Sequence, residues 1–169
     1  MKLLIAVSSK HGSTREIAAS ISQTVREAGV EVDVVDAQDV KSVAPYNAIV
    51  VGSAVHWGRW MGPARDLVNG SAELLRTRPV WLFSSGPLGR DIVDPADAAE
   101  GNRLLELVGA REHRVFPGKA DKQELGFVER RIVSMVKSPW GDHRDWEDIR
   151  AWAASIAGEL ATAPAGVGA

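Results

Sequence analysis

Residues 3–18 read LLIAVSSKHGSTREIA, and their character changes twice along the stretch. Leu3 to Val7 is a continuous apolar run, as expected for a strand that is buried on both faces of a sheet. From Thr14 onward, apolar residues recur at the spacing of one helix face, and Gly29 ends the pattern. The members of this face are Ile17, Ala18, Ile21, Val25 and Ala28. The stretch therefore predicts a strand, a short polar loop and a helix.

The alternation of strand and helix continues along the rest of the chain. Further strands are predicted at Val30–Val35, Ala48–Val51, Val80–Phe83 and Glu112–Phe116. Further helices are predicted from Gly62-Pro63 through Leu75, from Asp94-Pro95 to Val108, and from Trp146 to Leu160. Asp145 is the expected cap of the last helix, and Trp146 and Trp152 are expected in the core. This order predicts an α/β fold with an open parallel sheet covered by helices on both faces.

The composition limits the class of protein. The chain has 169 residues, 45% hydrophobic and 25% charged, so we expect one domain over residues 1–161 and a flexible tail at 162–169. A net charge of -2 argues against nucleic acid as the main partner. The absence of cysteine excludes disulfides and cysteine catalysis, and the histidines share no ligand spacing, so no metal is expected. No apolar run reaches the roughly 18 residues of a membrane span, and we expect a cytoplasmic protein.

The first loop has the features of an anion site. Ligands bind open parallel sheets at the carboxyl ends of the strands, where this loop begins. Ser13-x-x-Glu16 is a capping-box pattern, so the loop leads into a helix N-terminus whose free N–H groups favour a phosphate. Hydroxyls, a glycine that permits close approach and two potentially cationic side chains surround this point; they are Ser9, Lys10, His11, Gly12, Ser13 and Thr14. The alternative is that the serine and threonine only cap the helix.

Missing motifs narrow the choice of phosphate. The chain has neither the GxxxxGK motif of nucleotide-binding P-loops nor the GxGxxG motif of dinucleotide sites. A phospho-receiver domain needs carboxylates at these strand ends, whereas the first strand ends in Ser8-Ser9 and the third in Gly52-Ser53. A phosphate held by hydroxyls and amides without metal remains, and flavin mononucleotide (FMN) suits that description.

Two later loops could hold the flavin ring. Residues 52–62 read GSAVHWGRWMG, and a flat apolar ring system needs a flat apolar face, for which Trp57 is the choice. The alternative is that Trp57 and Trp60 both cover the edge of the sheet. Residues 84–90, SSGPLGR, have the composition of a turn, and their backbone groups could line the pyrimidine edge of the ring.

These segments resemble a known family. SSKHGSTREIA resembles the phosphate loop of flavodoxins, and together with VVGSAVHWGRW and GDHRDWEDIRAWAASIAGEL it resembles the flavodoxin-like, menaquinone-dependent protoporphyrinogen dehydrogenase group, from Lys2 to about Leu160. The resemblance implies a three-layer flavodoxin-like sandwich with strand order 2-1-3-4-5 and FMN as cofactor. It implies that residues 9–14 hold the phosphate. It also implies flavin contacts from Ala54, Val55, His56, Trp57 and Gly58 on one side and from Ser85, Gly86, Pro87 and Leu88 on the other.

The segment after the fifth predicted strand differs from the membrane-associated members, which are basic and aromatic there. Here its lysines and arginines are offset by Asp121, Glu124 and Glu129. A stripe of Leu125, Val128, Ile132, Met135 and Val136 predicts an inserted amphipathic helix over 124–137. The helix either packs on the domain, or covers the flavin, or meets a substrate, a protein partner or a membrane surface.

Three function classes follow from this interpretation. The first is an FMN-dependent oxidoreductase with a quinone or porphyrinogen among its redox partners, either of the protoporphyrinogen dehydrogenase kind or an FMN-dependent quinone reductase. In both, the cofactor performs the chemistry and no acid or base residue is required. The second is a flavodoxin-type electron carrier, a class that tends to be strongly acidic, unlike this chain. A flavin-free binding module is the third. The near-neutral charge and the insert favour the enzyme.

Overall fold

A computed structural model describes residues 1–86, 95–120 and 141–162 of the chain. The strands are β1 (Lys2–Ser8), β2 (Glu31–Asp36), β3 (Ala48–His56), β4 (Arg59–Trp60), β5 (Val80–Gly86), β6 (Glu112–Pro117), β7 (Lys119–Ala120) and β8 (Gly141–Asp142). The helices are α1 (Ser13–Glu27), the 3-10 turn η1 (Ala37–Asp39), α2 (Gly62–Gly70), α3 (Ala72–Leu75), α4 (Pro95–Val108) and α6 (Trp146–Thr162). The predicted insert at 124–137 lies outside the described residues, as does the predicted tail at 162–169 apart from Thr162, which is the last residue of α6.

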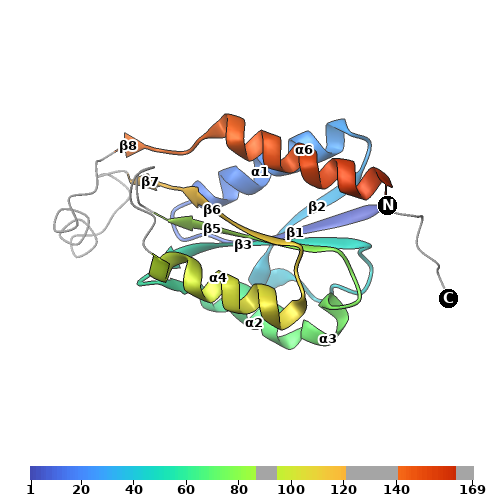
Figure 1. Cartoon of the computed structure of the whole chain (residues 1–169), viewed down its shortest axis with the longest axis horizontal. Coiled ribbons are helices and arrows are strands. Elements are labelled where there is room, and N and C mark those ends of the chain that lie inside the picture. Colours follow the sequence, from blue (N-terminus) through green and yellow to red (C-terminus); the bar gives the residue numbers. More distant parts are fainter. Residues whose placement is uncertain (87–94, 121–140, 163–169) are drawn as a thin grey trace.

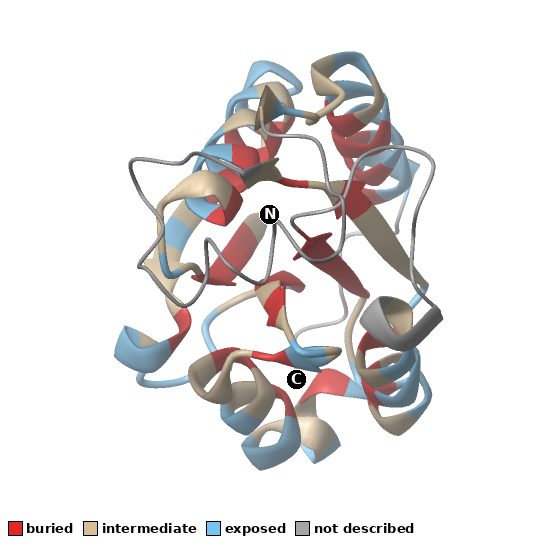
Figure 2. Ribbon diagram, turned by 90° about the vertical axis from the view of Figure 1, so that its left-hand side faces the viewer, coloured by how far each residue is buried: buried red, intermediate tan, exposed pale blue. Residues whose placement is uncertain are grey.

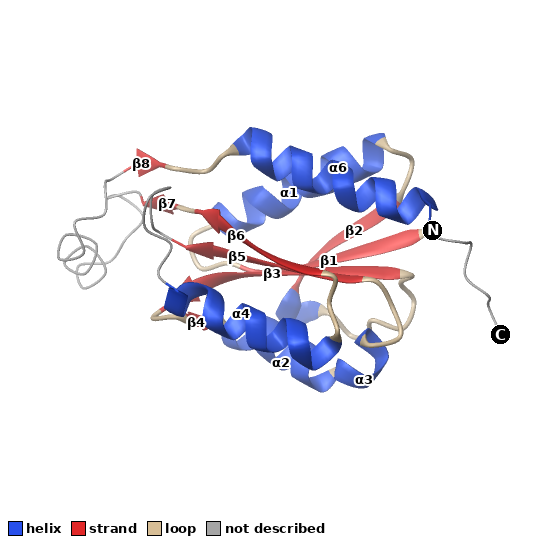
Figure 3. Cartoon of the chain, in the orientation of Figure 1, coloured by secondary structure: helices blue, strands red, loops and turns tan. Residues whose placement is uncertain are grey.

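The described elements form three layers around a parallel sheet. The sheet has the order β2-β1-β3-β5-β6, and β4 pairs with β3 in the antiparallel direction. Counting only the parallel strands, this is the expected order 2-1-3-4-5. Helices α1 and α6 lie on one face, and α2, α3 and α4 lie on the other (Figures 1 and 3). The flavodoxin-like architecture is therefore confirmed.

Two strands run further than the sequence predicts. β3 continues through Gly52 and Ser53 to His56, and β5 continues through Ser84 and Ser85 to Gly86. The predicted turn over 84–90 is therefore wrong for its first three residues, which remain in the sheet because β3 and β6 both pair with Ser84 and Ser85, and β6 also pairs with Gly86. The helix predicted from Gly62 through Leu75 is also divided, since α2 ends at Gly70 and α3 begins at Ala72.

A separate core fills the space on each face of the sheet, and Figure 2 shows buried strands between helices with exposed outer surfaces. Alternate residues of β1 enter opposite cores: Leu3, Ile5 and Val7 meet α1 and α6, and Leu4 and Ala6 face α2 and α4. The apolar run of β1 is explained by this double burial. Gly52 leaves space for a neighbour, because a Cβ there would lie 2.1 Å from the Phe83 ring.

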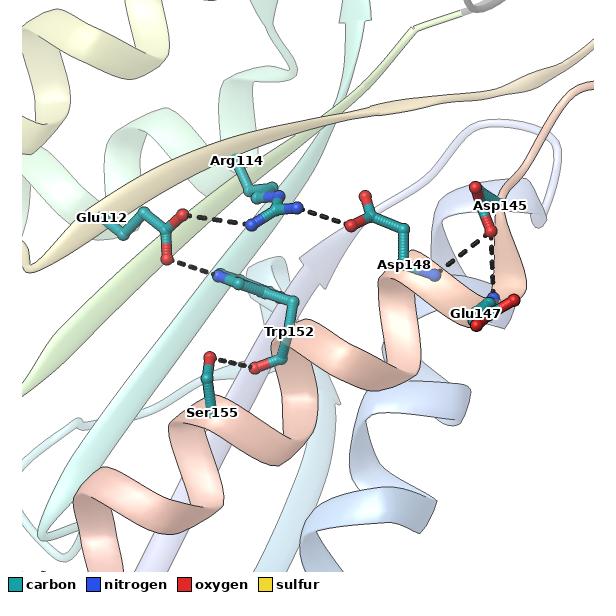
Figure 4. Close-up of polar contacts among 7 residues, drawn as sticks. All are labelled: Glu112, Arg114, Asp145, Glu147, Asp148, Trp152 and Ser155. Carbon is teal, nitrogen blue, oxygen red and sulfur yellow. Dashed lines mark hydrogen bonds and ion pairs between the residues drawn. The ribbon is translucent and has the colours of Figure 1, made fainter.

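Polar contacts fix α6 against the sheet edge (Figure 4). The Asp145 carboxylate accepts hydrogen bonds of 3.1 Å from the backbone N–H groups of Glu147 and Asp148, which confirms the predicted cap. Trp152 lies in the core, where its ring packs edge-on against Phe83 and its Nε1 donates to Glu112 at 2.7 Å. Trp146 is only half-buried and packs on the margin of that core, so the core prediction holds fully for Trp152 alone.

Candidate functional site

The carboxyl ends of β1, β3 and β5 bring three serines into one row. The strand registers place Ser8 beside Ser53 and Ser53 beside Ser84. All three are buried, with exposed fractions of 6%, 0% and 0%. They share a strand face with Ala6, Val51 and Leu82, so the row lies on the α2 and α4 side. Polar side chains thus replace the apolar core where the sheet meets its three carboxyl-end loops.

The first loop enters α1 without a side-chain cap. Gly12 is the N-cap residue, in the left-handed region at φ 86°, and no side chain caps the helix. The predicted capping box is therefore wrong, because Ser13 is the first helical residue and not the N-cap. The Glu16 carboxylate forms an ion pair with Arg144 at 2.6 Å instead. The left-handed conformation explains the glycine, because residues with a Cβ rarely adopt it.

The same loop has a polar atom that the protein does not satisfy. The Oγ of Ser13 is buried and has no hydrogen-bond partner among the described residues. A buried hydroxyl without a partner costs about 1–3 kcal/mol, and the first-turn N–H groups of a helix are also free of intrahelical bonds. An anion beside Ser13 would satisfy both sets of groups, so the loop fits a phosphate.

The second loop is a two-residue hairpin turn that presents a tryptophan. β3 and β4 pair His56 with Arg59, and Trp57 and Gly58 between them have φ values of 55° and 69°. Both turn residues are left-handed, as a type I′ turn requires, and asparagine or glycine is usual there. Trp57 is nevertheless 80% exposed. A strained and exposed aromatic side chain at a loop tip favours a functional role over a structural one.

Trp60, at the base of the hairpin, has the opposite environment. It is 2% exposed and packs among the core residues on the α2 and α4 side. The interpretation that both rings cover the sheet edge therefore holds for Trp60, and it is wrong for Trp57. The two rings differ because residues 57 and 60 occupy the tip and the second strand of the same hairpin.

A buried polar chain fixes Trp60 in place. Trp60 Nε1 donates to Ser84 Oγ at 2.8 Å, and Ser84 Oγ lies 2.8 Å from His113 Nε2. His113 Nδ1 lies 2.9 Å from Asn102 Oδ1, which can only accept, so Nδ1 carries the proton and Nε2 accepts from Ser84. Burial lowers the pKa of His113 to about 4, which keeps the ring neutral near pH 7.

Two further contacts hold the hairpin. Ser53 Oγ accepts from Met61 N at 2.9 Å and donates to the carbonyl of Ala54 at 2.8 Å. The backbone N–H of Trp60 donates to Glu100 of α4, whose carboxylate also lies 4.0 Å from Arg65 and 3.8 Å from Arg103. The sequence analysis did not assign these residues to the site. The sequence signal for Ser53 and Ser84 was a serine that directly follows the apolar run of a strand.

The predicted site residues reach the same sheet edge from three directions. The loop at 9–14, the hairpin residues 54–58 and the end of β5 at Ser85 and Gly86 all follow the carboxyl ends of adjacent strands. Pro87 and Leu88 lie outside the described residues. A hollow of about 60 Å³ adjoins the first loop on its β2 side, lined by Ser8, Ser9, Asp36 and Met61 among others. Arg15 and Asp36 border it as an ion pair at 2.8 Å.

Within the described residues, neither a metal-binding cluster nor a membrane-spanning helix is present. No cluster of three or more histidine, aspartate or glutamate side chains is arranged there to hold a metal ion. No helix within residues 1–86, 95–120 and 141–162 combines the length and apolar character that a membrane span requires.

Comparison with known proteins identifies the family. A model of the flavodoxin domain matches residues 4–147. The chain belongs to the flavodoxin domain family. Flavodoxin 2 of Bacillus cereus superposes with a TM-score of 0.66 at 20% identity over 94% of this chain and 99% of that one. Flavodoxin 1 of the same organism gives 0.65 at 18% identity over 95% and 99%. FMN is the cofactor of this flavodoxin domain, as the resemblance implied.

One curated relative lies outside the flavodoxins by name. The chain is 27% identical to protoporphyrinogen IX dehydrogenase [quinone] of Escherichia coli K12, over 93% of this chain and 95% of the relative. The match covers nearly the full length of both proteins. The resemblance to the protoporphyrinogen dehydrogenase group, expected from the sequence motifs, is confirmed by this match.

Proposed function

We propose that this flavodoxin domain is an FMN-dependent oxidoreductase that oxidises protoporphyrinogen IX and passes the electrons to a quinone. The observation that carries the proposal is the match to the quinone-linked dehydrogenase of Escherichia coli over 93% of this chain. Bound FMN supplies the redox chemistry, because its ring accepts and releases electrons. The chain's own residues bind, orient and shield the cofactor.

Each loop has a separate part in this proposal. Residues 9–14 hold the phosphate through first-turn N–H groups and the Ser13 hydroxyl, which has no other partner among the described residues. Trp57 packs its exposed ring on one face of the flavin, and residues 54–58 with Ser85, Gly86, Pro87 and Leu88 complete the ring site. The proposed FMN-binding domain spans residues 1–161, although α6 runs one residue further, to Thr162.

The hairpin orients Trp57 through its buried base. Trp60 Nε1 donates a hydrogen bond to Ser84 Oγ at 2.8 Å, and the backbone N–H of Met61 donates to Ser53 Oγ at 2.9 Å. These bonds to the sheet fix the base of the hairpin and so restrict the position of its tip. A preorganised aromatic face stacks on a flat ring at a lower entropic cost than a mobile loop would. This support accounts for the strain at residue 57, since the anchored base compels the chain to turn there.

The second candidate is an electron carrier without a substrate of its own. The structural similarity to flavodoxins of Bacillus cereus favours it. Against it stands the net charge of -2, because an acidic carrier docks basic partners through a strongly negative surface. The cytoplasmic location and peripheral membrane contact stay predictions.

Anaerobic flavin reduction separates these candidates. Purified protein with bound FMN is mixed with protoporphyrinogen IX, and the oxidised flavin absorbance is followed before and after a short-chain menaquinone analogue is added. The dehydrogenase loses the absorbance with the donor and regains it with the quinone. A carrier is reduced only by a reductase protein or dithionite, and protoporphyrinogen IX leaves its spectrum unchanged. Protein purified without yellow colour that takes up no added FMN would contradict both candidates.

A further inference from the structure

Arg144 is a nearly buried cation beside the phosphate loop. It lies between β8 and α6, and its side chain is 4% exposed. Its guanidinium donates to the Ser13 carbonyl at 3.3 Å and pairs with Glu16 at 2.6 Å. Asp142 holds it from the other side at 2.6 and 2.8 Å, and the Trp146 ring lies 4.4 Å from it. A residue from the end of the chain therefore fixes the first turn of α1.

The negative charges of the carboxylates beside the N-terminus of α1 must be neutralised if a phosphate is to bind there. A carboxylate in the first turn of a helix is favourable by itself, yet it repels a second anion at the same N-terminus. Glu16 is such a carboxylate. Asp142 adds another, and Lys119 lies opposite Asp142 in the β7–β8 pair. Glu16, Asp142, Lys119 and Arg144 together have a net charge of zero. Without Arg144, the other three side chains have a net charge of -1.

We propose that Arg144 is a positioning residue for the cofactor phosphate: it fixes the Ser13 backbone and neutralises Glu16, so that an anion can occupy the N-terminus of α1. The inference rests on FMN binding at this loop, as in the proposed function. Arg144 acts through Ser13 and Glu16 and needs no contact with FMN. It is a different kind of support from the phosphate loop itself, whose own side chains are mostly uncharged.

A purely structural role is the rival explanation. Arg144 joins α1 to the start of α6, and these helices are neighbours on one face of the sheet (Figure 1). A structural tie would matter equally for any flavin. An electrostatic role matters only for a ligand with a phosphate. Riboflavin, which is FMN without its phosphate, therefore distinguishes the two roles.

The test compares dissociation constants of FMN and riboflavin for the apoprotein at low ionic strength. Arg144→Gln is expected to weaken FMN on the order of tenfold and to leave riboflavin unchanged, and the difference should shrink as KCl is added. Glu16→Gln should tighten FMN, and Arg144→Gln combined with Glu16→Gln should regain most of the lost affinity. Arg144→Lys keeps the charge and should lose less than Arg144→Gln.

Arg111→Gln is the matched control. Arg111 also pairs with a glutamate, Glu159, and lies 5.1 Å from a tryptophan ring, Trp81, but at the amino edge of the sheet. Its loss changes the net charge by the same amount and should leave FMN affinity unaltered. If Arg144→Gln weakens FMN and riboflavin equally, or if Glu16→Gln gives no recovery, the inference is wrong. Wild-type protein that binds riboflavin and FMN alike, or neither, would instead contradict the phosphate site of the proposed function.

Discussion

The proposed phosphate loop at 9–14 and the Trp57 hairpin at 54–60 lie at the same edge of the sheet. They differ in whether the protein itself supplies hydrogen-bond partners for their buried polar groups. At the hairpin base, Trp60 Nε1, Ser84 and His113 satisfy one another. In the loop, the buried Ser13 Oγ has no partner within the described residues, and no side chain caps α1. The protein satisfies the polar groups at the hairpin base, whereas it leaves the Ser13 hydroxyl of the loop available to the proposed phosphate.

The difference separates stability from binding. A mutation at the hairpin base breaks contacts that exist without FMN and should lower the stability of the apoprotein. Loss of the Ser13 hydroxyl in the loop removes a group that the apoprotein does not use and should affect FMN alone. Each of the following variants tests whether this separation holds.

Gly101→Ala should have the largest effect. A Cβ at residue 101 of α4 would lie 2.2 Å from the His113 ring, so the ring must leave its place between Ser84 and Asn102. We expect a loss of about 3 kcal/mol in the free energy of unfolding, measured by urea denaturation of the apoprotein. Gly158→Ala in α6 is the control, because open space surrounds it, and it should gain up to about 1 kcal/mol. Equal stabilities for the two variants would show that the His113 chain does not support the fold.

Ser84→Ala and Ser13→Ala compare the two regions directly. Ser84→Ala leaves Trp60 Nε1 and His113 Nε2 without the hydroxyl that they contact and should cost about 1–3 kcal/mol of stability. Ser13→Ala should change apoprotein stability by less than about 0.5 kcal/mol. It should weaken FMN about tenfold, as expected for a lost hydrogen bond to a charged group. Urea denaturation and FMN titration by flavin fluorescence measure the two effects. The comparison fails if Ser13→Ala destabilises the apoprotein as much as Ser84→Ala does.

Acid should weaken the hairpin base through His113. The folded pKa of His113 is about 4 and the unfolded value is about 6.5, so the folded state favours the neutral ring. Its contribution is full above pH 6.5 and disappears as the pH falls toward 4, by about 2 kcal/mol for this partly exposed group. The pKa values of Asp33 and Asp142 are held below their usual range by Lys2 and Arg144, so these groups titrate at lower pH. His113→Gln should flatten the stability profile between pH 4 and 6.5, and an unchanged slope would remove His113 as its cause.

Trp57→Gly should have a small effect on stability, with the opposite sign to the losses at the hairpin base. Glycine adopts the φ of 55° at residue 57 without strain, and Trp57 buries little surface. We expect a gain of up to about 1 kcal/mol for the apoprotein, together with weaker FMN binding because the stacking face is lost. Thermal melting and flavin titration check both parts. Unchanged FMN affinity would remove Trp57 from the flavin site.

Much of the fold could be predicted from local pattern. The apolar run of β1 and the helical spacing of α1 predicted the first strand–helix unit, and the alternation that follows predicted the parallel sheet, whose strand order came from the family resemblance. These features depend on periodicity and on runs of apolar residues, which are local. The Asp145 cap was predictable for the same reason, because its hydrogen bonds reach only two and three residues along the chain.

Errors in the sequence analysis arose where distant segments compete for a residue. Ser13-x-x-Glu16 has a capping pattern, but Arg144, 128 residues later, takes the Glu16 carboxylate. Ser84 and Ser85 have the composition of a turn, but β3 and β6 pair with them and hold them in the sheet. Trp57 and Trp60 are alike in sequence, and only the turn between β3 and β4 sends one ring outward and the other into the core. The sequence by itself therefore determined the order of elements and the polar loop between the first strand and the first helix, since both are encoded in neighbouring residues. The tertiary structure decided which polar groups the protein satisfies and which it leaves without a partner among the described residues, because that depends on partners far away in the chain.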